Sequence, residues 1–362
     1  MYRQILIRLE DKTYQRIIWR SQNGEIKEFV LNTVTYGITS SPFLALRILR
    51  QLSMDEGHKY PLASEVICDE IFVDDVATGS NDKEILLQRQ DQTIGLLHEG
   101  GFEPRKWASN VPEILSRVPP ADRVTSLDLN DEQTLAQILG MHWEAKIDSF
   151  YYKVTQCTHQ TTKRGILSQI ARIWDPLGLL CPINLKAKSF IRKLWIEGLD
   201  WDDQVPEDLR LEWHQFYVKL NSINSIRVDR CVMMKEAMHN SLIGFCDASQ
   251  LGFCAVIYLR SETNEHEVKV SLLAAKSRVA PAKTVSIPRL ELCGAQLLAK
   301  LMEHVKTLLR QKIELHHVVT FTDSTCVLTW LKTLPCQLKT FEANRVTYIL
   351  ERIEPTSWRY IP

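Results

Sequence analysis

The spacing of hydrophobic and polar residues changes twice along the chain. Residues 1–145 alternate short runs of β-branched and aromatic residues with stretches of helical periodicity, a pattern typical of an α+β domain. Residues 161–198 predict two helices that are interrupted at Pro176 and Pro182, because proline cannot continue a helix in its interior. Another helix is predicted at about 207–221, so the pattern indicates a largely helical middle part.

The pattern changes again near residue 238, where apolar runs bounded by turn residues begin. A helix is predicted to start at Pro288, since proline is favoured in the first turn of a helix. Strands are predicted in four segments rich in β-branched and aromatic residues: 242–249, 253–259, 268–276 and 318–322. These alternations predict an α/β domain in the last third of the chain.

The adjacent acids Asp74 and Asp75 form the first candidate site. They lie between apolar residues, shortly before a Gly-Ser-Asn-Asp turn sequence, which predicts two short strands that meet at a tight hairpin. Two neighbouring carboxylates repel each other unless a cation lies between them, and Mg²⁺ or Mn²⁺ prefers such oxygen ligands. An Asp-Asp pair alone is more typical of a solvated turn. Only the surrounding motifs can indicate whether this pair binds metal.

A second candidate set consists of Asp247, Glu291 and Asp323. Asp247 interrupts an apolar strand, Glu291 falls in the first turn of the helix that Pro288 opens, and Asp323 ends a strand. Each acid also has an ordinary structural explanation: a turn-stabilising Asp, a partner of the helix dipole and a helix cap. Acids at such junctions can converge above one sheet, where they would bind divalent metal.

Composition narrows the class of protein. The chain has a formal net charge of zero, with 44 basic and 44 acidic residues, and 45% of its residues are hydrophobic, which is typical of a globular protein. No apolar stretch is long enough to span a membrane, and no secretion signal opens the chain, so we expect an intracellular protein, cytoplasmic or within virus-like particles. The nine cysteines form no Cys-x-x-Cys pair, which argues against a zinc or disulfide framework.

The charge is nevertheless segregated. Residues 161–196 carry seven basic residues against Asp175 alone, and residues 197–212 carry seven acids against one arginine. A local basic face binds phosphate whatever the total charge of the protein, although such faces are often merely solvated. The candidate contacts with a nucleic-acid backbone are Lys163, Arg164, Lys186, Lys188 and Arg192.

Four motifs of the N-terminal part, in this order, resemble the palm of a reverse transcriptase. They are the turn and helix start Tyr36-Gly37 to Ser41-Pro42, the hairpin Phe72-Val73-Asp74-Asp75, Lys106 after a Gly-Phe turn, and the hairpin at Leu139-Gly140. The resemblance implies that Asp74 and Asp75 bind the catalytic metal ions. It also implies that Tyr36, Gly37, Ser41, Pro42 and Lys106 face template and nucleotide, and that Leu139 and Gly140 form the primer grip.

Tyr2 resembles the aromatic residue of this family that excludes a ribose 2′-OH. The family's first metal-binding aspartate would then precede Met1, so we expect the polymerase site to lack one ligand. The segment from Arg172 to Gly178 (Arg-Ile-Trp-Asp-Pro-Leu-Gly) is similar to a stretch of BEL/Pao-type retrotransposon polyproteins.

The acids Asp247, Glu291 and Asp323 resemble the metal ligands of a retroelement ribonuclease H, whose fourth carboxylate would lie beyond Pro362. The resemblance therefore implies that each of the two sites lacks one carboxylate here, and we expect this chain alone to be inactive. The resemblance therefore implies a palm of a reverse transcriptase (1–150, α+β), a helical thumb and connection (151–237), and an α/β ribonuclease H-like domain with a mixed five-stranded sheet (238–362). Both sites would use two Mg²⁺ or Mn²⁺ ions for phosphoryl transfer. The implied partners are an RNA template, a DNA primer, an RNA–DNA hybrid, deoxynucleoside triphosphates and the other domains of the polyprotein.

Two other interpretations stay open. A copy that has lost its activity would keep the fold and bind nucleic acid without cleaving it. An aspartic peptidase, which such polyproteins also encode, would need an Asp-(Thr/Ser)-Gly loop. The segments that begin at Asp247 and Asp323 lack this glycine, which disfavours the peptidase.

Overall fold

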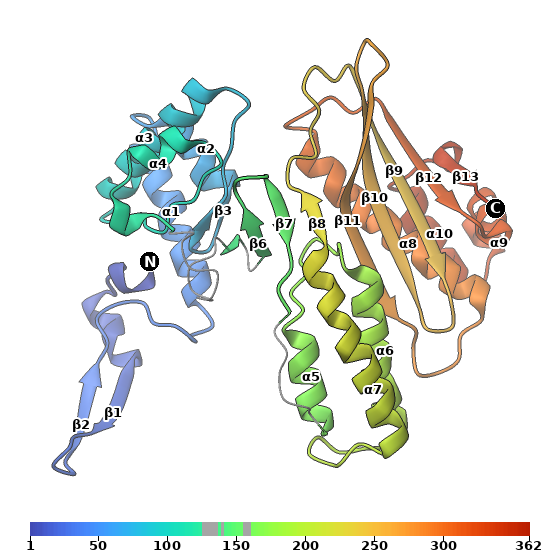
Figure 1. The fold of residues 1–362 in the computed structure, drawn as a ribbon, viewed down its shortest axis with the longest axis horizontal. Helices are drawn as coiled ribbons and strands as arrows, with labels where there is room; N and C mark the ends of the chain where they lie inside the picture. Colours follow the sequence, from blue (N-terminus) through green and yellow to red (C-terminus); the bar gives the residue numbers. More distant parts are fainter. Residues whose placement is uncertain (125–136, 139–140, 155–160) are drawn as a thin grey trace. The chain divides into compact units, whose positions relative to one another are not determined.

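The computed structural model describes residues 1–124, 137–138, 141–154 and 161–362 (Figure 1). They form two compact units, Met1–Asp148 and Ser149–Pro362. The three-part division predicted from the sequence stays a prediction, and residues 151–237 and 238–362 lie in the same unit. In the described part of the chain, no helix is both long and apolar enough to cross a membrane.

Helices dominate the core of the first unit. Helix α2 packs against α1 and α3, and their buried residues include Leu49, Ile67 and Leu96. The α-helices are α1 (Ser41–Glu56), α2 (Pro61–Asp69), α3 (Lys83–Glu99) and α4 (Pro112–Ser116). The strands are β1 (Arg16–Arg20), β2 (Ile26–Val30), β3 (Ile71–Phe72), β4 (Asp75–Val76), β5 (Gln137–Ile138) and β6 (Met141–Glu144). Short 3₁₀ turns occupy Tyr2–Gln4, Leu9–Tyr14 and Pro120–Asp122.

The second unit begins with strand β7 (Ser149–Tyr151) and three helices, as the sequence predicts for its helical part. The helices are α5 (Lys163–Ala171), α6 (Cys181–Ile196) and α7 (Glu207–Lys219), followed by the 3₁₀ turn Leu220–Ser225 and strand β8 (Arg227–Asp229). The side chain of Thr162 accepts the N–H of Gly165 and caps α5. Ile166, Phe190 and Trp213 bring the three helices together in one apolar cluster.

A mixed five-stranded sheet forms the rest of the second unit, in the order β11-β10-β9-β12-β13. Strands β9, β10 and β11 are antiparallel neighbours, whereas β12 runs parallel to both β9 and β13. The mixed five-stranded sheet that the sequence predicts is thereby confirmed. The strands are β9 (His239–Ala248), β10 (Gly252–Glu262), β11 (Val268–Val279), β12 (His317–Thr322) and β13 (Trp358–Tyr360).

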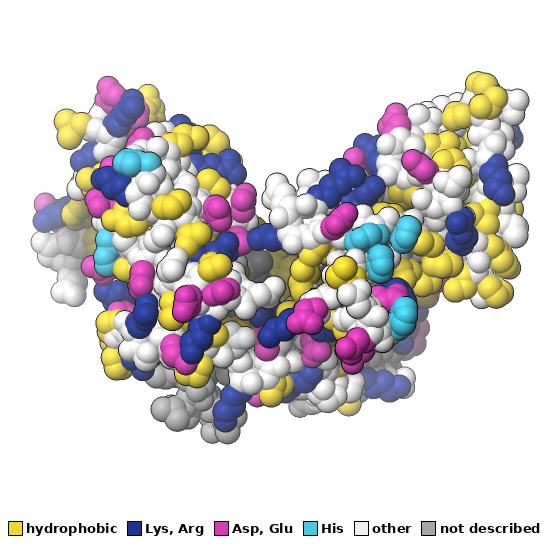
Figure 2. Space-filling view, turned by 90° about the horizontal axis from the view of Figure 1, so that it is seen from above, with side chains coloured by type: hydrophobic (Ala, Val, Ile, Leu, Met, Phe, Trp, Pro, Cys, Tyr) yellow, Lys and Arg dark blue, Asp and Glu magenta, His cyan; other side chains and the backbone are white. Residues whose placement is uncertain are grey.

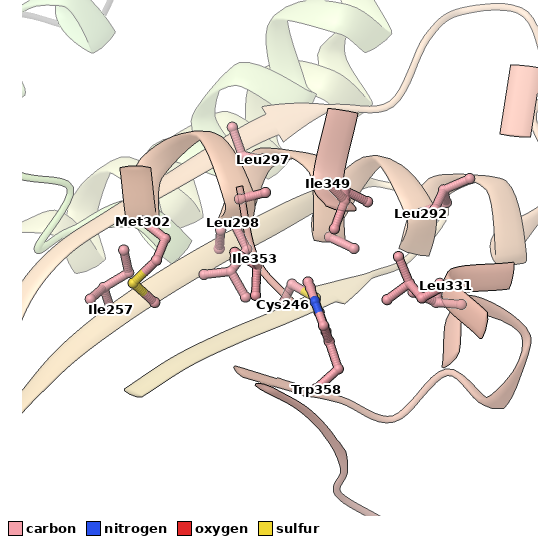
Figure 3. Packing of buried hydrophobic residues seen from close by; sticks show 14 of the residues in the cluster. Cys246, Ile257, Leu292, Leu297, Leu298, Met302, Leu331, Ile349, Ile353 and Trp358 are labelled. Atoms are coloured by element: carbon pink, nitrogen blue, oxygen red, sulfur yellow. The ribbon is translucent and has the colours of Figure 1, made fainter. Parts of the chain in front are cut away.

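Helix α8 (Ile287–Leu309) lies against β9 and β10 and forms the largest apolar core of the chain with them (Figure 3). Strand β9 and helix α8 come close together at Gly244, which has no side chain. A Cβ added there would lie 2.7 Å from Leu298 Cδ1 and 2.9 Å from Met302 Cε. Helices α9 (Thr325–Lys332) and α10 (Thr340–Leu350) complete this layer, together with the 3₁₀ turns Pro335–Gln337 and Pro355–Ser357. The sheet and α8 therefore fix each other's position by dense packing.

The segment between α5 and α6 covers part of the edge strand β11. Leu177 O accepts the N–H of Ala275 at 2.8 Å, and Gly178 lies against the same residue with φ of +78°. Ser277 Oγ donates to Cys181 O at 3.4 Å, which adds a contact with the start of α6. The Asp-Pro-Leu-Gly sequence thus attaches the helices to the sheet and satisfies an edge N–H that would otherwise be free to pair with another chain.

The stability losses of Gly178→Ala and Gly198→Ala should distinguish the contact between Gly178 and β11 from the strain of a left-handed backbone. A Cβ at Gly178 would lie 1.8 Å from Ala275 O, whereas one at Gly198, with φ of +71°, meets nothing within 4 Å. Gly198→Ala should therefore reduce the free energy of unfolding by about 1 kcal/mol, for a left-handed backbone alone. Gly178→Ala should cost roughly 3 kcal/mol, because the overlap adds to the strain. Urea unfolding followed by tryptophan fluorescence measures both, and equal losses would contradict the attachment.

Candidate functional site

Asp247 and Asp323 stand at the same end of the mixed sheet. Strands β9 and β12 are parallel neighbours, and Phe245 pairs with Phe321 in their register. Each aspartate follows two residues later, so the two are level where the strands end, on backbones about 4.8 Å apart. Both side chains are exposed.

Glu291 comes to this end of the sheet from helix α8. An added Cβ at Gly294 would lie 3.3 Å from Asp247 O and 3.5 Å from Cys254 O, so α8 crosses the ends of β9 and β10 at this point. Glu291 is three residues earlier, about 4.5 Å along the helix axis, and is half-buried. The three acids singled out in the sequence therefore belong to elements that meet at one end of the sheet.

The buried thiol of Cys246 and the partly buried thiol of Cys254 lie close enough to these acids for the acids' charge to affect their pKa. Burial raises the pKa of Cys246 far above its ordinary value, and the charges of Asp247 and Asp323 contribute in the same direction. Burial also raises the pKa of Cys254, which pairs with Asp247 across β9 and β10, and the Asp247 carboxylate adds to this rise. The raised pKa of each thiol favours its protonated form, so the carboxylates are the charged groups at this place.

The donor set suits a hard divalent cation. Three carboxylates, two of them exposed, supply the oxygen ligands that Mg²⁺ prefers, and Mg²⁺ usually keeps several waters of its own. Within the described ranges, no three His, Cys, Asp or Glu side chains are grouped closely enough to hold a metal ion. The structure thus brings the acids to one sheet end without closing them into a coordination sphere.

Asp74 and Asp75 lie at the hairpin that the sequence predicts. Phe72 pairs with Asp75 across β3 and β4, and Val73 has a φ of 55° in the two-residue turn between them. Both aspartates are exposed, while Ile71 and Val73 pack against the core of the first unit. The turn therefore presents two carboxylates to solvent, and their role as metal ligands stays a prediction.

Other residues that the reverse transcriptase resemblance singles out lie in varied surroundings. Tyr2 is buried, and its ring meets that of the exposed Tyr36 edge-on with 4.9 Å between ring centres, while its predicted contact with the nucleotide sugar stays a prediction. Gly37 has a φ of 83°, and Ser41 Oγ donates to Thr35 O at 2.6 Å at the start of α1, where Pro42 occupies the first turn. Lys106 is exposed, and Leu139 and Gly140 lie outside the described residues.

The structure corrects part of the predicted basic track. Lys163 is only 2% exposed: its Nζ lies 3.5 Å from the centre of the Trp195 ring and donates to Leu199 O, so Lys163 cannot contact a phosphate. Arg164 is exposed, but its guanidinium forms two hydrogen bonds with Asp202, of 2.7 and 2.9 Å.

The remaining members of the track lie on α6. Lys186 and Lys188 are exposed, and Arg192 donates to Pro281 O at 2.9 Å. Over the face of the molecule in Figure 2, basic and acidic side chains are interspersed, as the equal numbers of the two kinds suggest. The predicted track is thus reduced to two freely exposed lysines and one partly engaged arginine.

The sequence analysis missed an ion pair beside Glu291. Arg289, in the first turn of α8, donates to the buried Glu342 of α10 at 2.7 Å. The Arg289 guanidinium also lies 5.0 Å from the Phe341 ring, and Arg345 lies 3.6 Å from the same ring. Burial raises the pKa of Glu342, but the hydrogen bond and charge of Arg289 outweigh it and hold that pKa below its ordinary value. The two residues are 53 positions apart, so no local pattern signals the contact.

Comparisons with known proteins bear on the second unit. Residues 162–324 match the model of the Pao retrotransposon-like RNaseH-like domain. A ribonuclease H1 from the halophilic archaeon Halobacterium salinarum NRC-1 is a structural neighbour with 10% identity over 34% of this chain and 86% of its own, at a TM-score of 0.20. No curated protein matches. The prediction of a Pao-type ribonuclease H region is confirmed in these residues, and the comparisons do not extend to a reverse transcriptase.

The ion pair between Arg289 and Glu342 should stabilise the second unit at neutral pH. Arg289→Ala leaves a buried carboxylate without its cation, so we expect a loss of roughly 2 kcal/mol in the free energy of unfolding. Because the pKa of Glu342 is lowered in the folded state, the contribution is present above the ordinary glutamate pKa and disappears as the pH falls through the folded value. Unfolding measured at pH 7 and at pH 3 checks both statements.

Glu303→Gln is the matched control for this pair. Glu303 accepts a 2.8 Å hydrogen bond from Arg352, also between α8 and the end of the α10 segment, but its side chain is 49% exposed. Such an exposed pair is worth about 0–1 kcal/mol. Equal losses in the two variants at pH 7, or a loss in Arg289→Ala that persists at pH 3, would show that the Arg289 pair is not a buried electrostatic contact.

Proposed function

We propose that the chain is part of a Pao-type retrotransposon polyprotein and that its second unit cleaves the RNA strand of RNA–DNA hybrids. The observation that carries this proposal is the meeting of Asp247, Glu291 and Asp323 at one end of a mixed sheet. The ribonuclease H-like region matched at residues 162–324 supports it, because that region contains all the elements bearing these acids.

The chemistry follows from the type of side chain and its position. Two divalent ions would activate a water molecule and stabilise the departing oxygen in an in-line phosphoryl displacement. Asp247 and Asp323, exposed at the ends of neighbouring strands, would hold these ions from the sheet, and Glu291 would hold them from α8. Asp247 lies in β9, Glu291 lies in α8 and Asp323 directly follows β12, so all three acids are attached to elements that pack on a common core.

The substrate follows from the same reasoning. A hybrid presents a continuous phosphate backbone and the 2′-hydroxyl groups of one strand. The exposed Lys186 and Lys188 provide a cationic surface on α6, which packs against β11 within the same unit. We infer that the phosphate backbone lies over this surface while the acids meet one bond of the RNA strand.

In the parent polyprotein, Asp247→Asn and Asp323→Asn should each reduce Mg²⁺-dependent cleavage of a hybrid by at least 100-fold, because two-metal catalysis requires the negative charge of each ligand. Binding of the same hybrid in the presence of EDTA should remain within about two-fold of the wild type. Gel analysis of a labelled RNA strand and fluorescence anisotropy measure the two quantities.

Asp208→Asn is the control, since Asp208 is an exposed acid in the first turn of α7, away from the sheet. It should leave both cleavage and binding unchanged. If the parent polyprotein, which would contain the expected fourth carboxylate, binds hybrid but cleaves it with neither Mg²⁺ nor Mn²⁺, the element is the nucleic-acid-binding copy without activity. Cleavage of a peptide that pepstatin blocks would instead indicate a peptidase.

We further propose that the first unit belongs to an RNA-directed DNA polymerase, which would act on an RNA template, a DNA primer and deoxynucleoside triphosphates. The turn that exposes Asp74 and Asp75 supports this proposal, because a two-residue hairpin brings adjacent carboxylates to one place. The open surroundings of Lys106 and Tyr36 are compatible with contacts to nucleotide and template.

Metal binding at the hairpin can be measured directly on this chain. Mn²⁺ should broaden the amide signals of residues 70–80 in nuclear magnetic resonance spectra, and Asp75→Asn should largely remove the broadening, since the pair loses half of its charge. Asp82→Asn, six residues beyond the end of the hairpin at Val76, is the control; the Asp82 side chain caps α3 by accepting hydrogen bonds from the N–H groups of Glu84 and Ile85. Equal broadening in wild type and Asp75→Asn would refute a metal site at the hairpin.

A further inference from the structure

One segment of the second unit contains basic residues but no acidic ones. Residues 268–290 contain no aspartate or glutamate, and the first acid after them is Glu291. The same residues contain five cations: Lys269, Lys276, Arg278, Lys283 and Arg289. A segment with this charge would repel cations and attract polyanions over a distance of about 10 Å, the screening length at ordinary salt.

The sheet register places part of this segment at the end of the sheet where the acids meet. Arg278 pairs with Phe253, and Phe253 pairs with Ala248, the residue that follows Asp247. Arg278 is therefore two strands from Ala248, or roughly 10 Å between backbones. Along one strand of a duplex this corresponds to about three nucleotides, at roughly 3.4 Å each.

Lys276 and Arg278 share one face of β11, since residues two apart on a strand point the same way. Ser277, between them, points to the opposite face and donates to Cys181 O of α6. Lys276 pairs with Ala255, which packs in the core under α8. The two cations therefore lie on the side of the sheet from which α8 brings Glu291, and α6 does not cover them.

These two side chains and Lys283 are exposed, and none of the three has a side-chain partner among the described residues. The other two cations of the segment are engaged: Lys269 donates to Cys231 O and Arg289 to Glu342. The backbone that carries the exposed cations is held in place, because Ala280 donates its N–H to Leu251 O and Arg192 donates to Pro281 O. Positive charge on a fixed backbone binds a polyanion with little loss of chain entropy.

We propose that Lys276 and Arg278 contact the phosphate backbone of the nucleic acid on the α8 side of the acidic site. This inference rests on the proposed function, because it assigns a position on β11 to a hybrid that the acids would cleave. The hybrid would then have two contact surfaces: the lysines of α6 on one side of β11, and Lys276 and Arg278 on the other. The competing explanation is that charge on an edge strand only prevents association with other strands.

The test is the salt dependence of hybrid binding, measured by fluorescence anisotropy in EDTA between about 50 and 200 mM salt. Each lost phosphate contact should lower the slope of log affinity against log salt by about one unit. The double variant Lys276→Ala/Arg278→Ala should therefore bind more weakly and with a slope smaller by about two. Circular dichroism and thermal unfolding establish whether this variant and the control variant described next remain folded.

The matched control is Lys300→Ala/Arg310→Ala. Lys300 and Arg310 are an exposed lysine and arginine without a side-chain partner among the described residues; Lys300 lies near the middle of α8, about 13 Å along the helix axis from Glu291, and Arg310 lies just beyond its end. Arg310 is about 28 Å along the helix axis from Glu291. The control removes the same two charges at a different place. If the phosphate contacts are made by Lys276 and Arg278, the slope of the control should equal that of the wild type.

Three results would overturn the inference. The first is an unchanged slope in the β11 variant, particularly if that variant aggregates, which would favour protection of the edge strand. The second is an equal loss in the two variants, which would reflect total charge alone. The third is the absence of hybrid binding in the wild type, which would refute the proposed function itself and is thus distinguishable from the other two.

Discussion

The close approach of helix α8 to strands β9 and β10 is the contact on which the second unit depends. Glycine at positions 244 and 294 removes the side chains that would hold the helix away: a Cβ at the first would overlap Leu298 and Met302, and one at the second would press on Asp247 O. The same approach buries the apolar stripe of α8 and brings Glu291 to the end of β9. Stability and the arrangement of the acids therefore have one physical cause, and a change that moved the helix would affect both.

Much of this unit could be predicted from the sequence, because its signals are local. Apolar runs bounded by turns mark β9 and β10, Pro288 marks the start of α8, and each acid stands at the junction of an element. Likewise the hairpin at Asp74 and Asp75 follows from neighbouring residues alone. Periodicity and turn chemistry depend on residues a few positions apart, which is why a single sequence carries them.

The contacts that sequence analysis missed are those between distant residues. Lys163 looks like a surface cation until Trp195 and Leu199 of another helix and loop surround it. Tyr2 is buried by α1 and its neighbours, and the partner of Arg289 is on α10. Charge counted along the chain gives no information about which cations are already paired, and in the segment 161–196 this pairing removes Lys163 and Arg164 from the candidates. In the segment 268–290, in contrast, Lys276 and Arg278 stay exposed on β11, two strands from Asp247 in the sheet.

The burial of Lys163 also gives the protein an internal reporter of motion. Its amine is enclosed between the Trp195 ring and Leu199 O, whereas Lys186 and Lys188 on the same bundle are open to solvent. An acylating reagent can reach Lys163 only in molecules whose bundle has opened locally, so its labelling rate relative to the two exposed lysines measures the population of that open state. Lys163, which the sequence assigns to nucleic-acid binding, thus becomes through its surroundings a site whose acylation rate reports how often the bundle opens.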